Sequence, residues 1–102
     1  MRVYKVIIDS EAERDIYEIY SYLKQVMSQY GANKYIDAMM TEVQLLSVYA
    51  WIFQKSKSQT ILNIHPEARR MLSHNKKWNY IFHIEDEIVV VDRILASSTI
   101  SK

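Results

Sequence analysis

The opening of the chain changes from the hydrophobic period of a strand to that of a helix within residues 4–23. Apolar side chains first recur at every second position, as in an extended strand, at Tyr4, Val6 and Ile8. Asp9 and Ser10 then offer two helix N-caps, and Ser10 with Glu13 has the spacing of a capping box. The following apolar residues share one stripe of a helix: Ala12, Ile16, Ile19, Leu23 and Val26. The sequence therefore predicts a short strand that leads directly into a capped amphipathic helix.

Two helices are expected in the first half of the chain. The first should span residues 10–29, with Gly31, the sole glycine, just past its end in the left-handed conformation. A second apolar helical pattern begins at Asn33 and continues to about Ala50. Two helices joined by a turn of a few residues form an antiparallel hairpin, whose remaining apolar surface is most naturally covered by a sheet.

Strand patterns return in the second half. Residues 54–66 are expected to form a loop that a few apolar side chains attach to the core: Ile61, Leu62 and Ile64. The expected strands are 69–73, 78–84 and 88–95. The last of them is expected to be central, because its run of β-branched residues is suited to burial on both faces. These elements predict an α+β fold of order β-α-α-β-β-β, in which a helical hairpin packs on a small, mainly antiparallel sheet.

Length and composition limit the class of protein. Residues 1–102 should form a single domain, large enough to bury a core without metals or disulfides. The chain has no cysteine, which excludes a disulfide framework or a thiolate site and fits a cytoplasmic protein. It also has no apolar run of about 18 residues and no secretory leader pattern, so we expect neither membrane insertion nor secretion.

Basic residues cluster in the second half, although the net charge of the chain is only +1. Residues 68–84 contain no acidic side chain and four cations: Arg69, Arg70, Lys76 and Lys77. Such a patch is suited to phosphate or to an acidic partner. The alternative interpretation is a solvated strand edge whose charge discourages aggregation.

Neither a metal site nor a cofactor is expected. The three histidines, His65, His74 and His83, are spaced nine residues apart along the chain, which is unlike a ligand set. His83 is expected at the surface or at a sheet edge. A chain with one glycine has no nucleophile elbow or phosphate-binding glycine loop. The carboxylate pairs, Glu11 with Asp15 and Glu85 with Glu87, are interpreted as solvated charge.

One set of residues is compatible with chemistry on RNA. Arginines on a sheet would hold an RNA backbone and stabilise the charge that develops when a 2′-OH attacks the neighbouring phosphate. The candidates on the sheet are basic and aromatic: Arg69, Arg70, Lys76, Lys77 and Arg93, with Tyr80 and Trp78 nearby. In a ribonuclease the catalytic set would be Arg69, Arg70 and Arg93, with Tyr80 or His83 in the acid–base role. Tyr80 shares its strand face with Phe82, so a core position is the stronger interpretation for it. Arg93 must point out of the core or be paired, and Asp92 is expected on the opposite face of the strand.

The eight tyrosines exceed what one helix–helix seam requires. Amphipathic aromatic side chains of this kind are typical of protein interfaces as well as of core edges. The residues expected to bind a partner combine these tyrosines with the basic positions: Tyr17, Tyr20, Tyr49, Arg70, Lys76, Lys77 and Arg93.

The residues quoted above resemble the RelE/ParE toxin superfamily of bacterial type II toxin–antitoxin modules, also called plasmid stabilisation proteins. Members commonly begin with a short strand, then Ser-Pro-x-Ala and a Tyr-rich helix. Here Asp9-Ser10 stands in place of Ser-Pro, which preserves the cap. The matching positions in the first helix are Ala12, Asp15, Ile16, Ile19 and Tyr22. The segments ARRMLS and WNYIFHIEDEIVVVDRIL look like the terminal strands of the family, so the resemblance covers residues 3–95.

The resemblance implies a toxin that a cognate antitoxin neutralises, in a homodimer or a toxin–antitoxin hetero-oligomer. One branch of the superfamily cuts mRNA at the ribosome and uses basic sheet residues with a His or Tyr near the end of the last strand. Ala96 stands where many members have this His. That departure, together with the long hairpin and the low net charge, favours the ParE-like branch, which inhibits DNA gyrase without cutting mRNA. The alternatives are a RelE-like endonuclease and a non-toxic interaction partner with this fold.

Overall fold

The structure, a computed structural model, describes residues 3–100. Its main elements are β1 (Lys5–Ile8), α1 (Ser10–Val26), α2 (Gln29–Gln44), β2 (Arg69–Leu72), β3 (Trp78–Glu85) and β4 (Ile88–Ala96). Short helical segments fill the connections and the end: α3 (Leu46–Tyr49), η1 (Ala50–Ile52), α4 (Gln59–Leu62) and α5 (Ser97–Ile100). The predicted α+β fold and its β-α-α-β-β-β order are confirmed.

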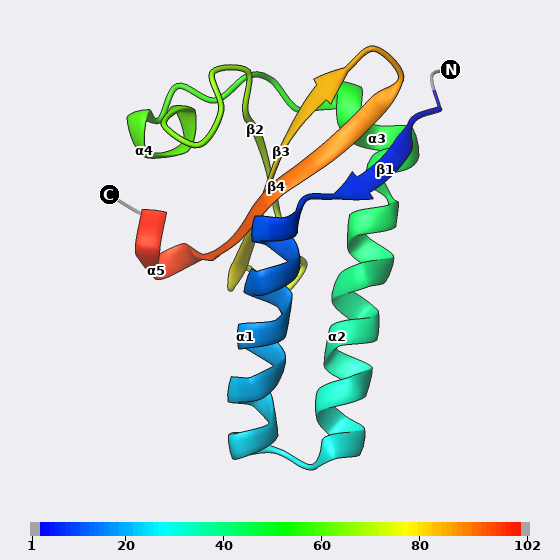
Figure 1. The fold of residues 1–102 in the computed structure, drawn as a ribbon, viewed down its shortest axis with the longest axis vertical. Coiled ribbons are helices and arrows are strands. Elements are labelled where there is room, and N and C mark those ends of the chain that lie inside the picture. The colour runs from blue at the N-terminus through cyan, green and yellow to red at the C-terminus, as the bar shows by residue number, and fades with distance from the viewer. Residues whose placement is uncertain (1–2, 101–102) are drawn as a thin grey trace.

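The four strands form one sheet in the order β1-β4-β3-β2. β1 runs parallel to β4, and the other two pairs are antiparallel, so the predicted mainly antiparallel sheet is confirmed. β4 is a central strand, as its β-branched run predicted. Figure 1 shows α1 and α2 side by side and antiparallel, with their connecting turn at the end of the hairpin that lies farthest from β1.

Helix α1 begins as the sequence predicted, but only one of its two candidate caps is used. Asp9 is the N-cap, and its side chain accepts a hydrogen bond from the backbone N–H of Glu11 at 3.2 Å. Ser10 is the first helical residue, so the Ser10–Glu13 capping box does not form at the N-cap. Asp9 holds the cap position because its backbone N–H still bonds to Val91 of β4, which extends the sheet by one residue.

The turn between the two long helices differs from the prediction. Helix α1 ends at Val26, not near residue 29, and α2 begins at Gln29, not at Asn33. Gly31 lies inside the first turn of α2 without a positive φ. The reason is Ser28, whose side chain accepts a hydrogen bond from the Gly31 N–H at 3.0 Å and caps α2. A serine N-cap therefore determines this turn instead of a glycine C-cap.

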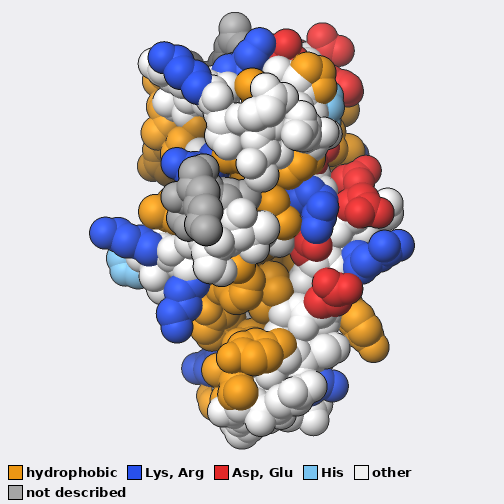
Figure 2. Space-filling view, turned by 90° about the vertical axis from the view of Figure 1, so that its left-hand side faces the viewer, with side chains coloured by type: hydrophobic (Ala, Val, Ile, Leu, Met, Phe, Trp, Pro, Cys, Tyr) orange, Lys and Arg blue, Asp and Glu red, His pale blue; other side chains and the backbone are white. Residues whose placement is uncertain are grey.

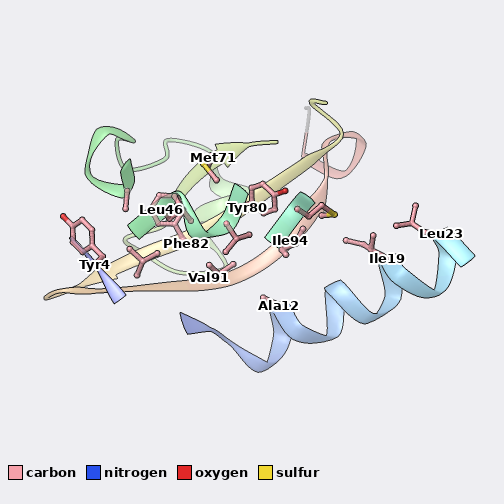
Figure 3. Close-up of a cluster of buried hydrophobic side chains, with 14 of the residues drawn as sticks. Tyr4, Ala12, Ile19, Leu23, Leu46, Met71, Tyr80, Phe82, Val91 and Ile94 are labelled. Carbon is pink, nitrogen blue, oxygen red and sulfur yellow. The ribbon is translucent and has the colours of Figure 1, made fainter. Parts of the chain in front are cut away.

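The core lies between the hairpin and one face of the sheet. Figure 3 shows Ala12, Ile19 and Leu23 along α1, on the side that faces Val91 and Ile94 of β4. The predicted alternation along β3 is confirmed, because Tyr80 and Phe82 are fully buried in this cluster.

The opposite face of the sheet carries a second, smaller cluster. Ile81 packs there with Ile61 of α4 and with Ala68, and all three are buried. Ile64 and Leu95 pack against them. Ile61 and Ile64 therefore attach residues 54–66 to the sheet as expected, although to this second cluster. These residues also contain one helical turn, α4, which the sequence had not indicated.

Val26 is the exception in the predicted buried stripe of α1. Its side chain is 58% exposed, although Ala12, Ile19 and Leu23 on the same stripe are buried. Figure 1 shows the reason: the hairpin extends past the end of the sheet, so the last turn of α1 has no strand beneath it.

One irregularity in β4 changes the direction of its side chains. Arg93 pairs with Ile81, whereas Val91 pairs with Phe82, so Asp92 is an extra residue without a partner in β3. Such a bulge places two successive side chains over one opposite residue.

The turn between β3 and β4 contains no glycine. Asp86 takes the left-handed position there, with a φ of 56°.

Candidate functional site

The centre of the candidate site is an ion pair between α1 and β4. Asp15 is 8% exposed and accepts hydrogen bonds from Arg93 Nε at 2.8 Å and from Arg93 Nη2 at 3.1 Å. The same carboxylate accepts the backbone N–H of Ile94 at 2.9 Å. β1 pairs with β4 only as far as Val91, so Asp15 binds the edge of β4 that β1 leaves free.

This ion pair corrects the interpretation of Asp15 as solvated charge. The Asp15 carboxylate accepts the backbone hydrogen bond that a neighbouring strand would otherwise accept, and it balances the charge of the Arg93 guanidinium. These bonds offset the cost of burying the carboxylate. Hydrogen bonding to Asp15 raises the pKa of Arg93. Arg93 is therefore a permanently charged group that α1 holds in place, with about a third of its side chain exposed.

The two arginines of β2 point to opposite faces of the sheet. Arg69 pairs with Phe82, and its guanidinium donates a hydrogen bond to the carbonyl of Phe53. Arg70 pairs with Ile81, which in turn pairs with Arg93. Arg70 and Arg93 therefore lie in one row, two strand spacings or about 10 Å apart at the backbone. Arg70 is exposed, so it is the outward-facing one of the two arginines.

The guanidinium groups of Arg70 and Arg93 do not point to a common site. Arg93 is directed to Asp15 of α1, at one side of the sheet. Arg70 lines a small polar hollow on the α4 side, with Ser56 and Lys57 among its walls. The structure therefore places Arg69, Arg70 and Arg93 in one sheet, but it orients their guanidinium groups in three directions.

Tyr80 is buried on the face opposite to Arg70. Its side chain is 0% exposed, and its hydroxyl donates a hydrogen bond to Glu42 Oε1 at 2.6 Å. Glu42 Oε2 accepts the backbone N–H of His74 at 2.8 Å. Burial, and secondarily the bond to Glu42, raises the pKa of Tyr80 far above its ordinary value. The phenol is therefore a protonated core group that ties the sheet to α2.

His83 is buried, not at a surface or edge position, which corrects that expectation. Its Nδ1 lies 2.7 Å from Asp92 Oδ2, and its side chain is 7% exposed. The ring of His65 stacks on it with a centroid distance of 3.6 Å and an interplanar angle of 4°. Asp92 can reach His83 because it lies two residues after Val90, the partner of His83 in β4, and so on the same face of the sheet.

His65 contributes to the same cluster from the segment after α4. Its Nδ1 accepts a hydrogen bond from the backbone N–H of Glu67 at 3.0 Å. Together, His65, His83 and Asp92 attach the 54–66 segment to β3 and β4. Within residues 3–100, no three His, Asp or Glu side chains gather closely enough to hold a metal ion.

Asp92 makes a testable contribution to the pH dependence of stability. Burial raises its pKa, although the hydrogen bond and charge of His83 act to lower it. The folded state therefore holds this proton more tightly than the unfolded state. Its contribution to stability is fully present below the ordinary Asp pKa, about 3.9, and is lost as pH rises through the higher folded value.

We expect Asp92→Asn to remove this loss while keeping an acceptor for His83. The difference in unfolding free energy, Asp92→Asn minus wild type, should rise with pH from about pH 4 and then level off. At pH 7 the variant should be as stable as wild type or up to about 1 kcal/mol more stable. Urea unfolding at a series of pH values measures this difference. A difference that falls as pH rises would contradict the raised pKa of Asp92.

The predicted partner-binding tyrosines do not form one group. Tyr17 and Tyr20 line a groove of about 650 Å³ between α1 and α2, with Ile16 and Ile36 as part of its apolar wall. Tyr17 is 71% exposed, whereas Tyr20 is half-buried and its hydroxyl donates to Asn33 Oδ1 at 2.7 Å. Tyr49 is exposed on α3, outside this groove.

The lysines of the predicted patch lie in the β2–β3 turn. Lys76 and Lys77 are both exposed, and Lys76 has a φ of 65°. Ala96, at the end of β4, pairs with Trp78 near these lysines. The basic residues of 68–84 are therefore divided between the β2 edge, where Arg70 lies, and this turn.

Sequence reasoning missed three residues of these networks: Asp15, Glu42 and His65. Asp15 had a usable signal, because it stands beside the apolar stripe of α1 while an arginine occurs within a central strand. Glu42 similarly lies next to Met39 and Val43, which are buried on α2. His65 had no local signal, because its partner depends on how the loop folds over the sheet.

Two of the three comparisons with known proteins find nothing. No model of a protein family matches the sequence, and no curated protein matches it. Among the described residues, no helix is both long and apolar enough to cross a membrane.

The comparison with solved structures does find the fold. A chain described as "Chromosomal ParDE TA system from P. aeruginosa" is similar with a TM-score of 0.78. The similarity covers 92% of this chain and 96% of that chain, at 16% sequence identity. This chain therefore has the fold found in a ParDE toxin–antitoxin system, consistent with the predicted RelE/ParE resemblance.

Proposed function

We propose that this chain is the toxin of a type II toxin–antitoxin module and acts in the ParE-like way, by binding a protein target such as DNA gyrase. The observation that carries the proposal is the shared fold, which covers nearly the whole of both chains. The cytoplasmic location and the bacterial, plasmid-stabilising role belong to the same proposal.

The arrangement of the basic residues supports a mechanism without bond cleavage. Acid–base catalysis needs a proton-transferring side chain within reach of the substrate. The candidates for that role here are buried: Tyr80 is bonded to Glu42, and His83 is bonded to Asp92. Arg93 is held by Asp15 and points away from Arg70, so the set does not form a clamp around one phosphate.

Growth and two biochemical assays test this proposal. Induced expression in a bacterial host should stop growth, and the purified protein should inhibit supercoiling by gyrase while mRNA in a translating extract stays intact. Cleaved mRNA with unaffected gyrase would instead select the ribosome-dependent endonuclease with Arg69, Arg70, Arg93 and Tyr80 or His83 as its site. Normal growth with folded protein would overturn both and leave a non-toxic partner protein.

The antitoxin is proposed to occupy the hairpin groove and a sheet edge. An apolar groove between two helices accepts the apolar face of a third helix, and a free edge accepts an added strand. Tyr17 and Tyr20 supply the groove wall, and Leu72, 46% exposed, lies at the β2 edge. The proposed assembly is a toxin–antitoxin hetero-oligomer or a homodimer. An unchanged gel-filtration volume on mixing with the protein of the neighbouring gene would contradict this part.

A further inference from the structure

A second surface, separate from the hairpin groove, lies where α1 extends beyond the sheet. It is a hollow of about 490 Å³ between the last turns of α1, the β2–β3 turn and the start of α5. We call it the α1-end surface and define it by Tyr22, Val26, Met27, Lys76, Lys77 and Trp78. Figure 2 shows this side of the molecule, with hydrophobic side chains exposed in its lower half and Lys and Arg side chains on both sides of them.

The apolar part of this surface continues the buried stripe of α1. Tyr22 and Val26 follow Ile19 and Leu23 by three residues each, so they lie on the same side of the helix. Ile19 and Leu23 are covered by the sheet, whereas Tyr22 and Val26 are each 58% exposed and Met27 is 36% exposed. A core-facing stripe that continues uncovered next to a hollow indicates a site for another polypeptide.

The charge of the surface selects the kind of partner. Lys76 and Lys77 line the hollow, and none of its described lining residues is acidic. Their turn is fixed, because the Lys76 N–H donates to the Ser73 carbonyl at 2.9 Å and Ser97 Oγ donates to the Lys76 carbonyl at 2.6 Å. Two cations on a rigid turn beside an apolar floor are complementary to carboxylates that flank apolar anchors.

The composition of the surface favours a polypeptide over nucleic acid. A single-stranded nucleic acid is bound by a track of cations with aromatic faces for its bases. Here two lysines lie at one edge, and the accessible floor includes the aliphatic side chains of Val26 and Met27. The indole N–H of Trp78 is already bonded to the Tyr35 hydroxyl at 2.9 Å, which fixes the ring as part of the wall.

We propose that the α1-end surface binds an acidic amphipathic segment of a protein partner, with its apolar side chains over Tyr22 and Val26 and its carboxylates at Lys76 and Lys77. This inference does not depend on toxicity, because it concerns binding at a surface that neither the hairpin groove nor the arginine row uses.

Two synthetic helical peptides of about 14 residues test the proposal. They carry the same Leu and Phe positions at helical spacing, and their remaining positions are mostly Glu in one and mostly Lys in the other. Titrations into the ¹⁵N-labelled full chain should show that the Glu peptide binds at least about tenfold more tightly. Its shifts should centre on Lys76, Lys77, Val26 and the Trp78 indole.

Matched variants make the test specific to this surface. Lys76→Glu/Lys77→Glu should abolish the preference for the Glu peptide, whereas Lys24→Glu/Lys34→Glu, with the same change in net charge, should keep it. Val26→Ser should weaken binding severalfold, and Ile52→Ser, an equally exposed apolar change elsewhere, should not.

Three results would overturn the proposal. The first is equal binding of the two peptides, and the second is a set of shifts centred on the Tyr17 and Tyr20 groove. The third is tighter binding of a single-stranded RNA 12-mer at Lys76 and Lys77, which would assign the surface to nucleic acid.

Discussion

Asp15→Ala is expected to lower the free energy of unfolding by about 3 kcal/mol. The substitution leaves the Arg93 guanidinium without its counter-ion and the Ile94 N–H without an acceptor. Breaking a buried ion pair costs about 3–5 kcal/mol, and the lower end applies because Arg93 is partly exposed to water. For a domain of this size, the midpoint of thermal unfolding should fall by about 12–24 °C.

The control for this experiment is Glu18→Ala, which removes an exposed carboxylate from the same helix. It should change stability by no more than about 0.5 kcal/mol. Asp15→Asn should be milder than Asp15→Ala, because its amide oxygen still accepts the Ile94 N–H. A loss for Asp15→Ala no larger than that of the control would show that the carboxylate does not connect α1 to β4.

A double variant separates the two roles of Asp15. Adding Arg93→Met to Asp15→Ala removes the uncompensated charge and should recover about 1–2 kcal/mol. The rest of the loss should remain, because the Ile94 N–H is still unpaired. Urea unfolding of the wild type, Asp15→Ala, Arg93→Met and the double variant gives the coupling energy between Asp15 and Arg93.

The same ion pair shows why the fold was easier to predict than the site. Helices and strands follow from local patterns: the alternation of Tyr80 and Phe82 with Ile81 predicted which face of β3 packs in the main core. Asp15 and Arg93 are 78 residues apart, so the local pattern around either residue does not identify the other as its partner. Their pairing depends on β1 ending at Ile8, which leaves the edge of β4 open to α1.

Two other differences arise from competition between local signals. Gly31 and Ser28 both favour a helix boundary, and the serine cap prevailed, which the sequence alone does not decide. The bulge at Asp92 has no signature in a run of β-branched residues, yet it makes Arg93, not Asp92, the partner of Ile81.

The second large effect is expected at Glu42, which joins α2 to the sheet and to the β2–β3 turn. Glu42→Ala removes the acceptors of the Tyr80 hydroxyl and of the His74 N–H. The phenol is fully buried, so an unpaired hydroxyl there costs about 1–3 kcal/mol. The His74 N–H also loses its acceptor, so Glu42→Ala should lower the unfolding free energy by about 2–3 kcal/mol in total. Asp37→Ala, an exposed carboxylate of the same helix, is the control.

Tyr80→Phe distinguishes the stability of this network from a chemical role of the phenol. Combined with Glu42→Ala, it removes the unpaired donor and should restore about 1 kcal/mol, which a double-mutant cycle in urea measures. Alone, it should cost about 1 kcal/mol and leave growth arrest unchanged, because a non-cleaving toxin needs no proton from the sheet. A folded Tyr80→Phe variant that no longer arrests growth would contradict this expectation and support the endonuclease alternative. A Glu42→Ala/Tyr80→Phe protein less stable than Glu42→Ala would show that the hydroxyl is satisfied by something other than Glu42.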